Sequence, residues 1–155
     1  MIMELAERQS IEWECQKLCN AFGYCLDQFD FESLGNLFLP DGVWSRHGHD
    51  LLGPKEILKQ LTKDGPQKNG PTMRTGMHFV SNFVPHRVEA NEVSASCYAL
   101  VFSSRDSNEG VKRFDPMSNI QTILYSDRFK KTAQGWRFAS RNGQYILRSP
   151  GWPGA

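Results

Sequence analysis

The sequence lacks the features that mark several large classes of protein. Its charge is balanced, with 18 Lys and Arg residues against 17 Asp and Glu residues and a formal net charge of +1. This balance gives no electrostatic reason to expect nucleic acid or an anionic membrane as a partner. No apolar run approaches the ~18–20 residues that would cross a bilayer, and no basic segment followed by an apolar one opens the chain. We therefore expect a cytoplasmic protein with neither nucleic-acid nor membrane partners.

Cysteine is scarce and poorly spaced for a metal centre or a disulfide framework. Cys15, Cys19 and Cys25 fall in one helical segment, and no Cys-x-x-Cys pair is present. Zinc sites in small domains typically use such closely spaced pairs. Reduced thiols that serve as small apolar residues fit the pattern. His47 and His49 form a His-x-His pair without an obvious third ligand nearby, so we interpret them as structural or solvated, and we expect neither metal nor cofactor.

Periodicity predicts helices in the first part of the chain. Apolar residues recur every three or four positions over 4–26, which is typical of an amphipathic helix. Asp30 is a good N-cap for a short second helix over 31–39, and a short strand over 43–46 follows. Gly53-Pro54 opens a third helix. The segment over 63–72, KDGPQKNGPT, indicates an exposed loop.

The rest of the chain has the character of strands. Alternation and turn residues predict strands over 73–87, 92–104, 117–131 and 136–147. Three helices followed by four long strands describe an α+β domain over 1–155. We expect a cone-shaped, strongly curved mixed or antiparallel sheet, wrapped around the N-terminal helices and enclosing a pocket.

The stretch over 73–84, MRTGMHFVSNFV, is apolar on both faces of its predicted strand. Met77 and Phe79 alternate with His78, and Asn82 falls on the same face as His78. A strand of this kind should be covered on both sides, so we expect His78 and Asn82 to point into an enclosed space. Two interpretations stay open: a satisfied polar pair, such as a core histidine bonded to the backbone, or a functional site.

Asp27 also has two interpretations. At about 100° per residue, Tyr24 and Asp27 lie roughly opposite the apolar stripe of the first helix, which favours a solvated carboxylate. Asp27 takes a different position if the helix ends near Leu26 and the chain turns inward. Asp27 and Asp30 permit such a turn, because aspartate is a favourable turn and cap residue.

Four segments occur in a distinctive order: YCLDQFDFESLGNLFLPDGVW, GPKEI, HFVSN and DRFKKTAQGWRFASRNG. Together they resemble the SnoaL-like group of the nuclear transport factor 2-like superfamily, which includes scytalone dehydratase and a hexachlorocyclohexane dehydrochlorinase. The resemblance covers residues 11–147. In those enzymes an aspartate before the second helix and a histidine on the first long strand form the active-site dyad, and the matching residues here are Asp27 and His78.

The resemblance implies a cofactor-independent lyase or isomerase, similar to a dehydratase or dehydrohalogenase, that acts on a small apolar molecule such as a cyclic one. His78 would remove a proton from carbon while Asp27 orients its ring. Scytalone dehydratase would also call for a second histidine on the next strand, where Ser103 stands instead. The one-aspartate, one-histidine pattern of the dehydrochlorinase therefore fits better. A steroid isomerase-like or epoxide hydrolase-like mechanism fits less well, because both depend on further inward carboxylates and Asp127 is the only obvious candidate on the late strands.

Candidate substrate-binding residues are side chains that can donate a hydrogen bond near the dyad: Tyr24, Arg74, Asn82, Tyr98 and Tyr125. Tyr24, one helical turn before Asp27, is the first choice. The alternative is that Tyr24 is a buried structural residue whose hydroxyl is hydrogen-bonded within the protein. Arg74 either reaches an acidic substrate group or pairs with a surface carboxylate at the rim.

The alternative function is a non-catalytic ligand-binding or scaffold subunit of the same fold, such as an oxygenase small subunit. Fold alone does not choose between these roles. For either role we expect a homo-oligomer, a dimer or trimer, with contacts through the outer sheet face or the tail around Trp152.

Overall fold

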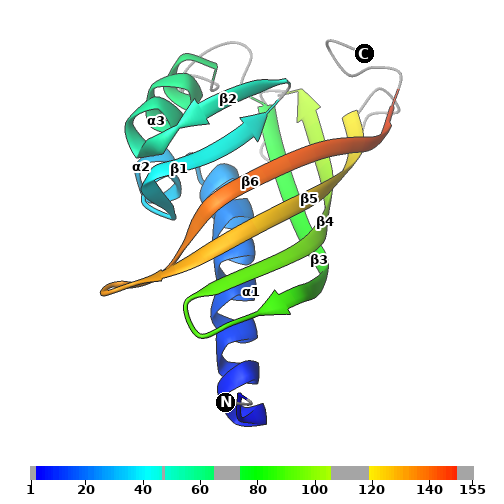
Figure 1. Cartoon of the computed structure of the whole chain (residues 1–155). Coiled ribbons are helices and arrows are strands. Elements are labelled where there is room, and N and C mark those ends of the chain that lie inside the picture. Colours follow the sequence, from blue (N-terminus) through cyan, green and yellow to red (C-terminus); the bar gives the residue numbers. More distant parts are fainter. Residues whose placement is uncertain (1–2, 47, 65–73, 106–118, 150–155) are drawn as a thin grey trace.

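The computed structural model describes residues 3–46, 48–64, 74–105 and 119–149 (Figure 1). Its elements follow the chain in the order α1 (Leu5–Asp27), α2 (Phe31–Gly35), β1 (Phe38–Arg46), β2 (His49–Leu52), α3 (Gly53–Asp64), β3 (Arg74–Val88), β4 (Glu92–Arg105), β5 (Asn119–Thr132) and β6 (Gly135–Arg148). The predicted α+β class is confirmed, because N-terminal helices accompany a curved, unclosed mixed sheet.

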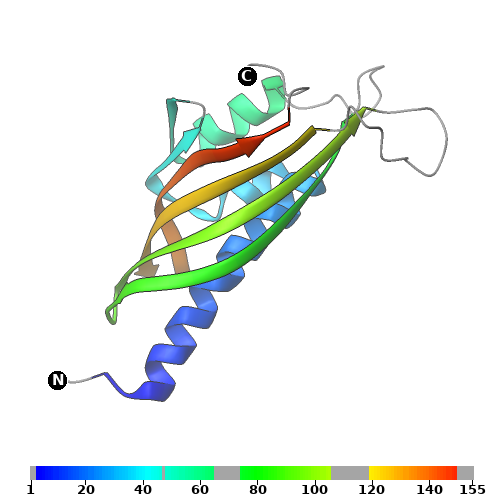
Figure 2. The same cartoon turned by 90° about the vertical axis from the view of Figure 1, so that its right-hand side faces the viewer.

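The six strands form one sheet in the order β2-β1-β6-β5-β4-β3. Strands β3 to β6 pair antiparallel with their sequence neighbours, whereas β1 runs parallel to β6. Figure 2 shows the long strands bending together, with α1 along one side of the sheet. Register shifts within the pairings of β3, β5 and β6 contribute to this curvature, because a bulge bends the strand that carries it.

The core lies between α1 and the sheet. Phe22 occupies its centre and makes edge contacts to the rings of Trp44 and Phe138, at centroid distances of 5.0 Å and 6.1 Å. The apolar stripe of α1 is buried as its periodicity predicts, and its buried members are Ile11, Cys15, Leu18, Cys19, Phe22 and Cys25. No helix among the described ranges is both long and apolar enough to cross a membrane.

The region after α1 differs from the prediction. Helix α2 ends at Gly35 instead of continuing to residue 39, and β1 begins at Phe38 instead of residue 43. Phe38 pairs with Phe138 of β6, and the Phe138 N–H donates to the Leu37 carbonyl at 2.8 Å. Pairing with a distant strand therefore overrides the local helical pattern. The same sheet extends to β2, which the sequence did not indicate, while His47 lies outside the described residues.

Strand β3 carries a bulge that changes its faces after Ser81. Asn82 has a φ of 52°, and the register to β4 shifts between Ser81 and Val84. A bulge adds one residue to the strand and so reverses the alternation beyond it. Phe83 consequently packs against the core, and Val84 is 49% exposed. Asn82 is exposed as well, so its expected inward orientation is wrong.

The outer face of the sheet is rich in exposed apolar side chains. Met77, Phe79 and Tyr98 are 52%, 51% and 42% exposed on the side of the sheet away from α1. The expected cover on both sides of β3 is therefore not supplied by the described part of the chain. This face is where the expected contact between copies of the chain would fall.

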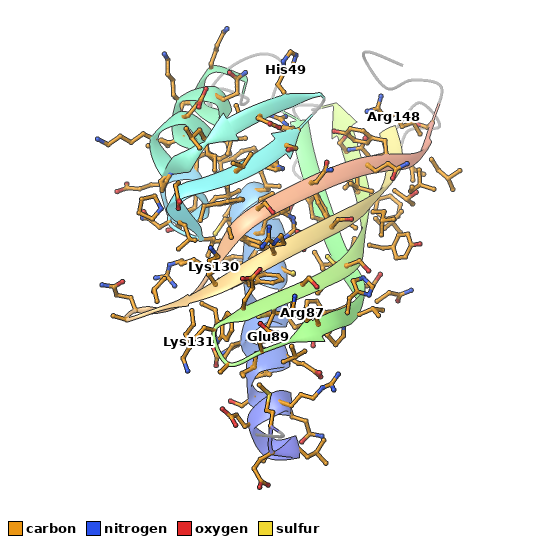
Figure 3. The ribbon with its side chains drawn as sticks, viewed as in Figure 1. His49, Arg87, Glu89, Lys130, Lys131 and Arg148 are labelled. Carbon is orange, nitrogen blue, oxygen red and sulfur yellow. The ribbon has the colours of Figure 1, made fainter. Side chains whose placement is uncertain are left out.

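The basic end of β5 is solvated. Arg128 forms an exposed ion pair with Glu92 at 2.5 Å, and Lys130 and Lys131 are exposed beside it. Figure 3 shows Lys130 and Lys131 near Glu89 at this end of the sheet. Oppositely charged neighbours compensate the cluster, so it does not indicate an anionic partner.

Candidate functional site

The end of α1 turns Asp27 toward the sheet. Asp27 is the last residue of the helix, and Phe29 two residues later adopts a left-handed φ of 57°. Asp30 then caps α2 by accepting a hydrogen bond from the Ser33 N–H at 3.1 Å. The chain therefore reverses within three residues, which places the Asp27 carboxylate against β3. The solvated position that helical periodicity alone favoured is wrong.

Asp27 and His78 make two hydrogen bonds to each other. Asp27 Oδ1 lies 2.6 Å from His78 Nδ1, and Asp27 Oδ2 accepts from the His78 backbone N–H at 2.9 Å. The side chains are 19% and 17% exposed. Because a carboxylate only accepts hydrogen bonds, Nδ1 carries the proton in a neutral ring and Nε2 keeps its lone pair. Both carboxylate oxygens are engaged, so the imidazole has one defined orientation.

Gly23 allows α1 to approach β3 at this point. A Cβ atom added to Gly23 would lie 3.2 Å from the His78 Cβ and 3.3 Å from the Val80 Cγ2. Both contacts are tighter than ordinary van der Waals distance. The glycine is thus needed for close packing of helix against strand, and this packing sets the separation of Asp27 from His78.

We expect Gly23→Ala to disturb this pair more than the helix. Alanine gains about 1 kcal/mol of helix propensity, but overpacking costs about 1–3 kcal/mol, so the net loss of stability is small. The displaced His78 should nevertheless show a changed imidazole environment by NMR. Gly76→Ala is the matched control, since its added Cβ meets only the Phe102 carbonyl at 3.8 Å. Identical His78 spectra in wild type and Gly23→Ala would contradict the prediction.

Three of the predicted substrate-binding side chains are not beside the pair. Tyr24 is 68% exposed on α1, Tyr98 is on the outer face, and Asn82 is exposed at the bulge. Tyr125 is buried on the inner face and stacks against Arg141, 3.8 Å from the guanidinium carbon to the ring centroid. The Arg74 side chain lies outside the described ones. The predicted pocket stays a prediction.

Polar residues that the sequence did not single out lie on the inner face with His78. Cross-strand pairing runs from His78 to Val101, from Val101 to Gln121, and from Gln121 to Arg148. Residues that pair directly point to the same face of a sheet, so Gln121 faces α1 as His78 does. Gln121 is buried. The signal in the sequence was that Gln121 lies two residues before the apolar Ile123, which places both on the same face of the strand.

A buried charged cluster lies further along the same face. Arg141 and Asp127 are both inaccessible to solvent, with 3.7 Å from Arg141 Nε to Asp127 Oδ1. The Cys19 and Cys97 thiols lie 3.6 Å and 3.8 Å from Asp127 Oδ2. The guanidinium also stacks on the Phe22 ring, 4.3 Å from its centroid. Arg141 is charged at any ordinary pH, so this buried cation requires the Asp127 anion.

Burial controls the ionisation of the cluster. Loss of hydration raises the pKa of Asp127 to about 6, although the nearby Arg141 charge and the two thiols oppose the shift. The hydrogen bond from Cys19 and the charge of Arg141 together lower the pKa of Cys97, despite its burial. At neutral pH the cluster therefore holds an ionised Asp127 opposite Arg141.

The cluster also contains three potential metal ligands. The ligand atoms of Cys19, Cys97 and Asp127 lie within 4.8 Å of one another. Arg141 Nη2, however, donates to Cys97 Sγ at 3.4 Å, so a positive charge already lies at the place where a second cation would bind. We interpret the group as an internal ion pair with thiol neighbours.

Asp127 should give the free energy of unfolding a measurable pH dependence. Its folded pKa of about 6 exceeds its ordinary value of 3.8, so between these values the folded state binds its proton more tightly than the unfolded state. As pH rises from about 4 to 6, this group should remove about 3 kcal/mol of stability. Denaturant titrations of wild type and Asp127→Asn across this range measure the difference. Equal slopes against pH in the two proteins would contradict the prediction.

Solved structures share this architecture over most of the chain. A protein of Novosphingobium aromaticivorans provisionally assigned as a scytalone dehydratase has a TM-score of 0.75 at 19% identity, covering 94% of this chain and 91% of its own. The type 3 hexachlorocyclohexane dehydrochlorinase of Novosphingobium barchaimii has a TM-score of 0.75 at 18% identity, covering 98% and 97%. A provisionally assigned aromatic ring hydroxylase of Novosphingobium aromaticivorans has a TM-score of 0.71 at 16% identity, covering 90% of this chain and 92% of its own. At these identities the likeness defines the fold, a cone of the nuclear transport factor 2-like class.

The sequence identifies the family within this class. The family model of the SnoaL-like domain matches residues 7–142, so the chain belongs to the SnoaL-like family. Among curated proteins, none is similar enough in sequence to count as a relative. The resemblance of the four sequence segments to this family is confirmed.

Proposed function

We propose that this protein is a cofactor-independent lyase or isomerase in which His78 is the general base. The observation that supports the proposal is the pair of hydrogen bonds that the Asp27 carboxylate accepts from the Nδ1–H and the backbone N–H of His78. A histidine is a competent base near neutral pH when its imidazole is neutral. A carboxylate on Nδ1 keeps the lone pair on Nε2 and stabilises the imidazolium that forms when a proton is taken up.

The reaction would begin at a carbon atom of the substrate. His78 Nε2 removes a proton from that carbon, and the electron pair of the C–H bond forms a new double bond. In an elimination the leaving group departs from the neighbouring carbon with its bonding electrons. In an isomerisation the proton returns from the imidazolium to another carbon. The solved structures with a similar fold include a dehydrochlorinase, which supports elimination as the first reaction to test.

The proposal is tested by screening cyclic alcohols, halides and enones for loss of water, loss of halide or movement of a double bond. Loss of water or hydrogen halide is followed by mass spectrometry and movement of a double bond by proton NMR, with His78→Ala as the blank for each compound. Turnover that depends on His78 is the expected result. Equal turnover by the variant would remove His78 from the mechanism. No turnover by the wild type across all three compound classes would favour a ligand-binding or scaffold role instead.

A further inference from the structure

We infer that Gln121 and Ser103 form a subsite that binds a carbonyl or hydroxyl oxygen of the substrate. The inference rests on the proposed function, because it assigns a substrate class to that site. It points to a small ring compound that carries oxygen on the edge away from His78, and it disfavours a substrate without hydrogen-bonding groups.

The two side chains are buried without being satisfied. Ser103 and Gln121 are 8% and 4% exposed. The Ser103 Oγ and the Gln121 Oε1 atoms have no hydrogen-bond partner within the described ranges of the chain. Buried polar atoms in folded proteins almost always have a partner, so two exceptions in neighbouring residues indicate a place that a bound molecule completes.

Strand pairing places both residues on the face that carries His78. Val101 pairs with His78 on one side and with Gln121 on the other, and Ser103 follows two residues after Val101. Directly paired residues and residues two apart share a face. Neighbouring strands are ~4.8 Å apart, so the Gln121 backbone lies ~10 Å from that of His78. Side chains that reach inward from both positions can contact opposite edges of one small ring.

The surroundings of Gln121 favour an oxygen that gains negative charge. Arg148 pairs with Gln121 across β5 and β6, and its guanidinium carbon lies 3.6 Å from the centroid of the Tyr145 ring. Figure 3 shows Arg148 at the end of β6, at the opposite end of this strand from Lys130 and Lys131. Proton removal beside a carbonyl places negative charge on its oxygen. An amide, a hydroxyl and a nearby cation stabilise such an oxygen.

Two probes that differ by one oxygen test the subsite without turnover. Tetralin and 2-tetralone share a bicyclic ring, and only the ketone accepts hydrogen bonds. We expect the wild-type chain to bind 2-tetralone about tenfold more tightly than tetralin in NMR titrations, the ratio that about 1.4 kcal/mol of hydrogen bonding gives. Gln121→Met keeps the side-chain volume but removes the amide, and should bring the two affinities within about twofold of each other.

The melting temperature separates a binding role from a structural one. Removal of an unsatisfied buried amide should leave the melting temperature of Gln121→Met unchanged or raise it. Gln144→Met, at an exposed position of β6, is the matched control and should keep the tenfold preference. Ser103→Ala is the second variant and should reduce the preference without unfolding the protein.

Several results would overturn the inference: equal affinity for the two probes, no binding of either, an unchanged preference in both variants, or a preference lost together with a lower melting temperature. Failure of the proposed function is distinguishable from these. His78→Ala should keep the preference for 2-tetralone, because the subsite does not include the base. If the protein prefers 2-tetralone over tetralin but turns over no compound, the proposed enzymatic function is refuted and the subsite is retained. If turnover depends on His78 but the two probes bind equally, only the subsite is refuted.

Discussion

Replacement of His78 by alanine should lower kcat/KM by about 10²–10⁴-fold, the usual contribution of a general base. Asp27→Asn should lower it over a similar range, because the neutral amide neither stabilises the imidazolium nor requires the proton to sit on Nδ1. The measurement is turnover of whichever compound the screen identifies, with circular dichroism to verify that each variant is folded. A variant that keeps wild-type turnover removes that residue from the mechanism.

Matched controls are available for both substitutions. His86→Ala changes an exposed histidine whose Nε2 lies 3.0 Å from the Ser96 hydroxyl, and Asp41→Asn changes an exposed carboxylate of β1. Neither should alter turnover. Nitrogen-15 NMR of the His78 ring gives a readout that needs no substrate. The wild type should carry its ring proton on Nδ1, and Asp27→Asn should shift the population toward Nε2. If the neutral ring of the wild type carries its proton on Nε2, then Nε2 is excluded as the basic nitrogen.

Replacement of Arg141 by methionine should destabilise the protein by about 3–5 kcal/mol, the typical cost of removing one partner of a buried ion pair. Methionine fills much of the space but leaves the Asp127 carboxylate buried without its counter-charge. Chemical denaturation measures the change in the free energy of unfolding. Arg128→Ala is the matched control, because its ion pair with Glu92 is exposed and should be worth less than about 1 kcal/mol.

A double variant tests whether the charge or the packing is responsible. Asp127→Leu combined with Arg141→Met replaces both charges with apolar groups, which is often neutral or stabilising in a buried pair. The double variant should therefore be more stable than Arg141→Met alone. If it is less stable than the single variant, the loss comes from the packing of Arg141 between aromatic rings and not from the uncompensated carboxylate.

Patterns within single elements predicted most of the helices and strands. The apolar stripe of the first helix, the Asp30 cap and the Gly53-Pro54 helix start are properties of neighbouring residues, and local physics decides them. The long strands of the second half were predicted because alternation and turn residues are local as well. The first part of β1 and all of β2 were not, because pairing with β6 and with each other stabilises them.

The candidate site was predicted unevenly for the same reason. Asp27 and His78 were found through the family resemblance, which carries positional information that the periodicity of one helix lacks. Tyr24 was chosen because it is one turn from Asp27, yet it lies opposite the apolar stripe of the helix and is 68% exposed. Asn82 was placed on the wrong side because one additional residue at a bulge reverses the alternation of a strand.

The sequence by itself determined the fold class, the family and the residue types able to act as a base and its carboxylate partner. Only the tertiary structure decided which side chains share a face with His78. That choice depends on register between β3, β4 and β5, and the shift of a pairing by one residue would turn Gln121 to the opposite face. Only the tertiary structure, likewise, brought Asp127 and Arg141 together in the core, because their contact joins two strands whose burial neither local pattern reveals.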